Sequence, residues 1–112
     1  MFLADMVAAA DAITAFVAGS NEAEFIANDL LRSAVLQKLT VIGEAAARLS
    51  DELKQRHPTV PWRDIVAFRN IAVHRYFGID WSIVWNAATS DVPTLREQTA
   101  RLLGTLGEGG ST

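Results

Sequence analysis

Cysteine is absent from this 112-residue sequence, and histidine occurs only twice. Without cysteine, a disulfide scaffold, a thiol nucleophile and a cysteine-ligated metal site are all excluded. The two histidines, His57 and His74, lie far apart, and neither has a histidine, aspartate or glutamate four positions away. We therefore expect no metal site in this protein.

Basic residues are also missing from the start of the chain, where none precedes Arg32. The same stretch carries Asp5 and Asp11, so it lacks the positive start that a secretory signal requires. No uninterrupted apolar run approaches the ~18 residues that a membrane-spanning helix needs. We therefore expect a cytoplasmic protein that has no membrane partner.

Positive charge is scarce overall but concentrated in one part of the chain. The net charge of -3 argues against a general nucleic-acid coat, because such proteins carry an excess of lysine and arginine. Residues 48–76 nevertheless hold six of the ten basic side chains against three acidic ones, which gives this stretch +3 and leaves -6 for the remainder. An anionic substrate is expected to bind this stretch weakly and in a salt-sensitive way. The six basic residues are Arg48, Lys54, Arg56, Arg63, Arg69 and Arg75.

Apolar residues recur with helical periodicity along nearly the whole chain, and no segment alternates as a half-buried strand would. A first helix is expected to end at Gly19. Asn21 and Glu24 form a capping pair that opens a second and much longer helix, which ends before Pro58.

Three further helices are predicted in the second half of the chain. Pro61 fits the first turn of a third helix, which runs to about Phe77. Asp80 caps a short fourth helix, and Asp91 with Pro93 opens a fifth. The predicted fold is all-α, an antiparallel up-down bundle of four to five helices. A chain of this length suits one core, so we expect one helical domain over residues 1–106 and a flexible tail over residues 107–112.

The third helix carries polar side chains on a face that differs from an ordinary solvated one. The arc expected to pack into the bundle is formed by Ile65, Phe68, Ile71 and Ala72. The opposite arc interleaves four polar residues with three sizeable apolar ones, namely Arg69, Asn70, His74, Tyr76, Val66, Val73 and Phe77. Because a helix that is apolar on two opposed arcs needs two packing partners, a second subunit is the simplest candidate for the outer one.

The polar residues of this arc permit chemistry on a phosphodiester. The planar guanidinium of Arg69 suits a phosphate or the extra charge of its transition state. The imidazole of His74 titrates near neutrality and can move protons, and Asn70 can orient the imidazole or a phosphate oxygen. Without a metal cluster, the reaction open to them is attack by an RNA 2′-hydroxyl on the neighbouring phosphate. Arg63 and Arg75 belong to the same basic stretch and are candidates for supporting substrate binding.

Simpler interpretations stay open on the residues alone. An arginine and a histidine on a helix are usually an interface or surface feature, and Tyr76 could be an amphipathic aromatic residue at a helix end. The basic stretch could be a solvated face or a docking site for an acidic protein. His57 is expected to be a loop residue. A plain dimerisation helix is disfavoured, since an interface without a phosphate gains little from two facing cations.

Several segments together resemble the HepT branch of the HEPN superfamily. The signature is Arg69-Asn70, three residues, His74, one residue and Tyr76. The similarity extends over essentially everything up to about Leu106. Its other segments are Phe2-Leu3-Ala4-Asp5-Met6, Val41-Ile42-Gly43-Glu44-Ala45-Ala46, Pro61-Trp62, Ile79-Asp80 and Val84-Trp85.

This resemblance implies a toxin of a prokaryotic toxin-antitoxin pair, a homodimeric and metal-independent ribonuclease that needs no cofactor. Arg69 would bind and stabilise the phosphate, His74 would be the general acid or base, and Asn70 would support both in a cleft at the dimer interface. The implied antitoxin is a minimal nucleotidyltransferase that transfers AMP to Tyr76. A tRNA substrate is suggested only at the level of the family. The alternative is a non-catalytic subunit that binds a nucleotide or phosphate as partner of a nucleotidyltransferase.

Overall fold

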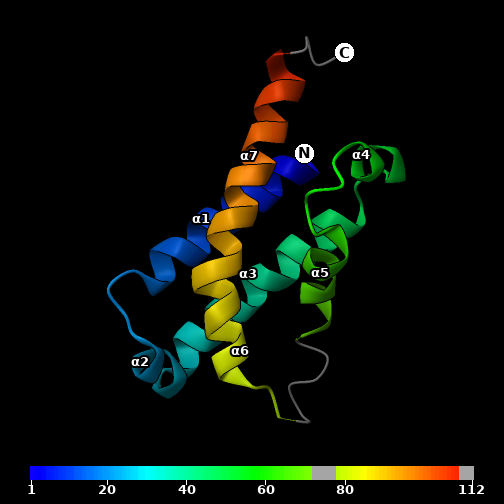
Figure 1. Ribbon diagram of the computed structural model, residues 1–112. Coiled ribbons are helices and arrows are strands. Elements are labelled where there is room, and N and C mark those ends of the chain that lie inside the picture. The colour runs from blue at the N-terminus through cyan, green and yellow to red at the C-terminus, as the bar shows by residue number, and fades with distance from the viewer. Residues whose placement is uncertain (72–77, 109–112) are drawn as a thin grey trace.

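The computed structural model describes residues 1–71 and 78–108 of the chain, and this described part is helical without a β-strand (Figure 1). The prediction of an all-α fold is confirmed. Chain direction alternates along α1, α3, α5 and α7 in Figure 1, as in an up-down bundle. Within the described ranges, none of the helices combines the length and apolarity needed to cross a bilayer.

Three long helices supply most of the hydrophobic core. They are α1 (Phe2–Val17), α3 (Asp29–Ala47) and α7 (Val92–Glu108), and α1 packs against both of the others. The side chains that share this core and are fully enclosed include Met6, Ile13, Val35, Leu39, Ile42 and Val92. An ion pair from Arg96 Nε to Asp11 Oδ1, 2.8 Å long, links α7 to α1 at the surface. This hydrogen bond raises the pKa of the Arg96 guanidinium.

The prediction of a single long helix after Asn21 is wrong, because the chain forms three helices there. They are α2 (Glu22–Ala27), α3 and α4 (Asp51–Arg56). The Asn21 and Glu24 capping box is confirmed. Two further caps interrupt the helix: the Asn28 side chain accepts from the Leu31 amide, and the Ser50 hydroxyl accepts from the Leu53 amide. Short polar side chains that bond to nearby backbone amides compete with helix continuation, which explains both breaks.

The expected separation of the last two helices is also wrong. Asp80 caps α6 (Trp81–Asn86) as predicted, by accepting from the Ser82 amide. A π-helical turn, η3 (Ala87–Asp91), then joins α6 directly to α7, so Asp91 lies within a continuous helical run. Pro93 has no amide hydrogen and its ring crowds the preceding turn, and the wider π turn accommodates both effects.

The C-terminal helix is longer than predicted. α7 continues to Glu108, two residues beyond the expected end of the helical domain at residue 106. Residues 109–112 lie outside the described residues, so the flexibility of a tail stays a prediction. The division into a domain over residues 1–106 and a tail over residues 107–112 likewise stays a prediction.

Candidate functional site

The helix α5 (Trp62–Ala67) leads into the motif, and the core holds the start of this helix in place. Trp62 and Ile65 are buried in the core. The indole Nε1 of Trp62 donates a hydrogen bond to the carbonyl oxygen of His57 at 3.0 Å. His57 itself caps the end of α4 in a loop conformation, as predicted. Pro61 lies at the N-cap of α5, immediately before the first turn.

The third helix changes its geometry inside the motif, where an uninterrupted α-helix was expected. After Ala67 the backbone tightens into a 3-10 turn, η1 (Phe68–Asn70). Phe68 and Ile71 pack against the core as predicted. Val66 packs there too, although the helical periodicity had placed it on the outer arc. The expected continuation to Phe77, and with it Ala72 and Val73, lies outside the described residues.

Arg69 lies where the main chain of the motif touches α3. A Cβ atom built on Gly43 would lie only 2.4 Å from the Arg69 amide nitrogen and 3.0 Å from the Val66 carbonyl oxygen. Any side chain at position 43 would therefore push the two segments apart. This backbone contact explains why Val66 is covered, since α3 occupies part of the arc that had been assigned to a second subunit.

The guanidinium of Arg69 forms an ion pair with α3 as well. Its Nη1 lies 3.4 Å from Oε1 of Glu44, a residue distant in the sequence. The two side chains are 44% and 50% exposed, so water screens their attraction. In the sequence, Glu44 stood out only as part of a segment of the family resemblance. The one sequence feature that could have indicated its contact with Arg69 is that Glu44 directly follows Gly43.

The remaining predicted site residues divide into two groups. Asn70 is exposed beside Arg69 on η1, and Arg63 is exposed on α5. His74, Arg75 and Tyr76 lie outside the described residues. The structure therefore brings Arg69 and Asn70 together on one exposed turn, while the roles of all six predicted residues stay predictions. Within residues 1–71 and 78–108, no group of three or more potential metal ligands is found.

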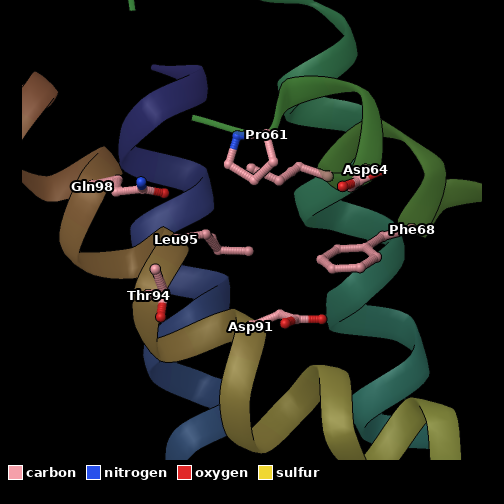
Figure 2. Close-up of a pocket in the computed structure, with 8 residues that line it drawn as sticks. Pro61, Asp64, Phe68, Asp91, Thr94, Leu95 and Gln98 are labelled. Carbon is pink, nitrogen blue, oxygen red and sulfur yellow. The ribbon is translucent and has the colours of Figure 1, made fainter. Parts of the chain in front are cut away.

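The cavity drawn in Figure 2 is separate from the exposed turn of Arg69 and Asn70. It encloses about 190 Å³ between α5 and the start of α7. Figure 2 shows Phe68 facing Leu95 across it, with the carboxylates of Asp64 and Asp91 at its edges. Neither Arg69 nor Asn70 lines this cavity. Two carboxylates at its edges make it a poor site for a phosphate.

A shallow groove of about 250 Å³ is lined in part by Glu44, the ion-pair partner of Arg69. Its polar lining is dominated by Glu44, Arg48 and Asp5, and its apolar lining includes Phe2. Arg48 belongs to the basic stretch and lies one helical turn beyond Glu44. The groove therefore presents both signs of charge next to the ion pair of Arg69 and Glu44.

Known proteins similar to this chain carry ribonuclease names. Residues 6–102 match the model of the family described as "Ribonuclease HepT-like". "Putative RNase MJ1380" from Methanocaldococcus jannaschii is 36% identical over 97 residues, which cover 87% of this chain and 89% of that protein. "Probable ribonuclease HepT" from Thermococcus cleftensis is 30% identical over 101 residues, 90% of this chain and 92% of that protein. No solved structure matches this chain.

The family match spans most of the chain and includes the whole described site, from α5 through η1. It also agrees with the all-α bundle. This chain therefore belongs to the ribonuclease HepT-like family.

Proposed function

We propose that this chain is the ribonuclease toxin of a prokaryotic toxin-antitoxin pair, acting on RNA in the cytoplasm without a metal ion. The observation that carries the proposal is the exposed turn of Arg69 and Asn70, whose main chain is held against α3 at Gly43. A cation and an amide on a rigidly placed turn are suited to binding a phosphodiester. The ribonuclease names of its relatives support RNA as the substrate class.

The proposed reaction is attack by a 2′-hydroxyl on the adjacent phosphate. His74 accepts the proton of that hydroxyl, the bond from O2′ to phosphorus forms, and the bond from phosphorus to O5′ breaks. The imidazolium of a second copy donates the proton that O5′ needs, so the products are a 2′,3′-cyclic phosphate and a 5′-hydroxyl. Arg69 stabilises the charge that develops on the non-bridging oxygens, and Asn70 orients the reacting groups.

A homodimer would bring two copies of these groups together. An apolar groove of about 220 Å³ begins at Ile71, directly after Asn70, and extends to Ile83, which is 64% exposed. Covering such apolar surface with a second copy would be favourable, because it removes that surface from water. The same association would place the motif of each chain in a composite cleft.

Two flanking arginines are proposed to guide the RNA. Arg63 is exposed on α5, in the same stretch of the chain as Arg69, and Arg75 follows His74. Because the rest of the chain is acidic, RNA binding should be local and should weaken as salt rises.

The proposed antitoxin is a minimal nucleotidyltransferase that transfers AMP from ATP to Tyr76, so that the phenol oxygen forms a bond to the α-phosphorus while pyrophosphate leaves. An adenylyl group on this residue would place a bulky anion near Arg69 and occupy the phosphate site by charge pairing and by size. Intact mass of the protein, expressed with and without its neighbouring gene product, tests this step. A mass gain in AMP-sized increments that Tyr76→Phe abolishes is expected, and an unmodified Tyr76 in the co-expressed protein would contradict it.

The ribonuclease proposal is tested by RNA cleavage in the presence of a chelator. Arg69→Ala and His74→Ala should each lower the cleavage rate by about 10²- to 10⁴-fold, because they remove transition-state stabilisation and proton transfer. Arg101→Ala is the matched control, since Arg101 is an exposed arginine of α7 whose ion pair, among the described residues, is with Glu97 of the same helix. Its rate should equal that of the parent.

Either of two results would overturn the proposal. One is cleavage by His74→Ala at the parental rate, which would remove the acid-base role. The other is a parent protein that binds RNA or nucleotide but cuts neither, which would favour the non-catalytic phosphate-binding subunit.

A further inference from the structure

Two consecutive residues of α3 contact the two ends of Arg69. Gly43 lies against its backbone, so closely that a Cβ atom there would overlap with the Arg69 amide nitrogen. Glu44, the next residue, meets the guanidinium through the 3.4 Å contact between Oε1 and Nη1. Both contacts come from one turn of a 19-residue helix, and both join segments that are distant in the sequence.

This turn of α3 is fixed by its packing in the core. The residues around Glu44 on the chain, namely Ile42, Gly43, Ala45 and Ala46, are all buried, while the Glu44 side chain projects to the surface. The Glu44 carboxylate is therefore attached to a segment of backbone that core packing holds in place. Arg69, by contrast, extends from the short 3-10 turn η1, which contributes no buried residue of its own.

An arginine on such a turn needs a partner to hold its side chain in one geometry. Its long side chain loses rotamer freedom when it is fixed, and a planar fork binds phosphate well only when it is already aligned. The ion pair with Glu44 engages Nη1, and Nη2 and Nε lie outside it. Neither nitrogen bonds to another of the residues that the structure describes, so both offer donors that a phosphate can accept from.

We propose that Glu44 is a positioning residue, which holds the Arg69 guanidinium in the orientation that the RNA phosphate requires. This inference rests on the proposed ribonuclease function and adds to it a residue outside the recognised arginine and histidine motif. The charge of Glu44 opposes a bound phosphate only weakly, because both partners of the ion pair are about half exposed to water.

The kinetic test compares three substitutions at position 44. Glu44→Ala should lower kcat for RNA cleavage by about 10- to 100-fold, because a misplaced reacting group costs that much, with a much smaller change in KM. Glu44→Gln should recover most of the rate, since its amide oxygen still accepts a hydrogen bond from the guanidinium. Glu44→Asp, whose carboxylate is one methylene shorter, should fall between the two.

Glu97→Ala is the matched control for these substitutions. Glu97 also forms an exposed ion pair with an arginine, Arg101, but within α7 and away from the motif. Its loss should leave kcat unchanged. The opposite pattern at position 44, an unchanged or raised kcat with a lowered KM for both Glu44→Ala and Glu44→Gln, would overturn the proposal, because it would mean that Glu44 competes with the phosphate.

A second measurement does not depend on RNA cleavage. The Nε–H signal of Arg69 in the NMR spectrum, assigned by its loss in Arg69→Lys, reports how ordered the side chain is. Its order parameter should be high in the parent and fall in Glu44→Ala, while the signal of Arg101 stays unchanged. Equal disorder of Arg69 in the parent and in Glu44→Ala would overturn the positioning role.

These two measurements separate the two proposals. If the parent cuts no RNA but the Arg69 signal responds to Glu44→Ala, the ribonuclease function fails and the positioning of Arg69 by Glu44 stands. If His74→Ala and Arg69→Ala abolish cleavage while Glu44→Ala cuts at the parental rate, the ribonuclease function stands and the positioning role fails.

Discussion

The three long helices and the segment from Trp62 to Ile71 are built in opposite ways. Along α1, α3 and α7, buried apolar side chains recur at helical spacing and face the core. Along α5 and η1, only Trp62 and Ile65 are buried, and Arg69 and Asn70 are exposed. In Figure 1, α5 lies beside α3 at the edge of the molecule, away from the contact of α1 with α7.

Fold stability and the proposed chemistry therefore depend on separate sets of residues, and the two sets are in contact at one turn. It is the turn of α3 at Gly43 and Glu44, where the helix belongs to the core on one side and contacts Arg69 on the other. Substitutions in the long helices should therefore change the free energy of unfolding, and substitutions on η1 should change activity. Only substitutions at this turn should change both.

The largest effect on stability is expected in the core of the long helices. Leu39→Ala should lower the free energy of unfolding by about 2–5 kcal/mol, because Leu39 is fully enclosed and its removal leaves a cavity. Urea denaturation measures this loss. Leu30→Ala is the control on the same helix, since Leu30 is 81% exposed and its loss should stay within about 0.5 kcal/mol. Equal losses in the two variants would show that α3 does not pack as described.

A smaller loss is expected where the two regions meet. Gly43→Ala should lower the free energy of unfolding by about 1–3 kcal/mol, because its methyl group overlaps with the backbone of Arg69. It should also slow RNA cleavage, since the motif is displaced from α3. Thermal unfolding and the cleavage assay check the two effects.

The control for this prediction is a second helical glycine. Gly104→Ala in α7 meets no atom within 4 Å and should stabilise the protein by about 0.5–1 kcal/mol, because alanine favours the helix. A Gly43→Ala variant that is as stable and as active as the parent would contradict the claim that α3 holds the motif through Gly43.

The smallest of these effects is expected at a helix cap. Asn28→Ala should cost about 0.5–2 kcal/mol, because the Leu31 amide loses the side-chain oxygen that it donates to. Asn86→Ala is the matched control, since Asn86 is exposed and its side chain makes no capping hydrogen bond. Differential scanning calorimetry of the pair would detect the difference, and an Asn86→Ala loss as large as that of Asn28→Ala would refute the capping argument.

Local signals predicted much of the secondary structure but misjudged its continuity. The caps at Asn21 and Asp80 were predictable because each bonds to an amide two or three residues away. The breaks at Asn28 and Ser50 were missed because the apolar stripe continues past both residues, and periodicity alone cannot show which polar side chain turns to cap a backbone amide. The continuity of the helix through the π turn before Pro93 was not predicted either. A proline that follows a wider turn inside a helix and a proline in the first turn of a new helix give the same sequence pattern.

The candidate site was predictable only in part. The exposure of Arg69 and Asn70 followed from helical periodicity, and their residue types indicated phosphate chemistry. The role of Glu44 did not follow, because its contact with Arg69 spans two helices and depends on how they pack. The second half of the motif, with His74 and Tyr76, stays a prediction from the sequence.

By itself, the sequence determined the all-α class, the inward faces of its helices and the order of the motif residues, because apolar spacing and capping side chains act over a few neighbouring positions. The contact of α3 with Arg69 on η1 depends on the tertiary structure, through the missing side chain of Gly43 and the carboxylate of Glu44. The physical reason is close packing: whether two helices can touch depends on the shapes of both surfaces at once, and no local pattern contains both.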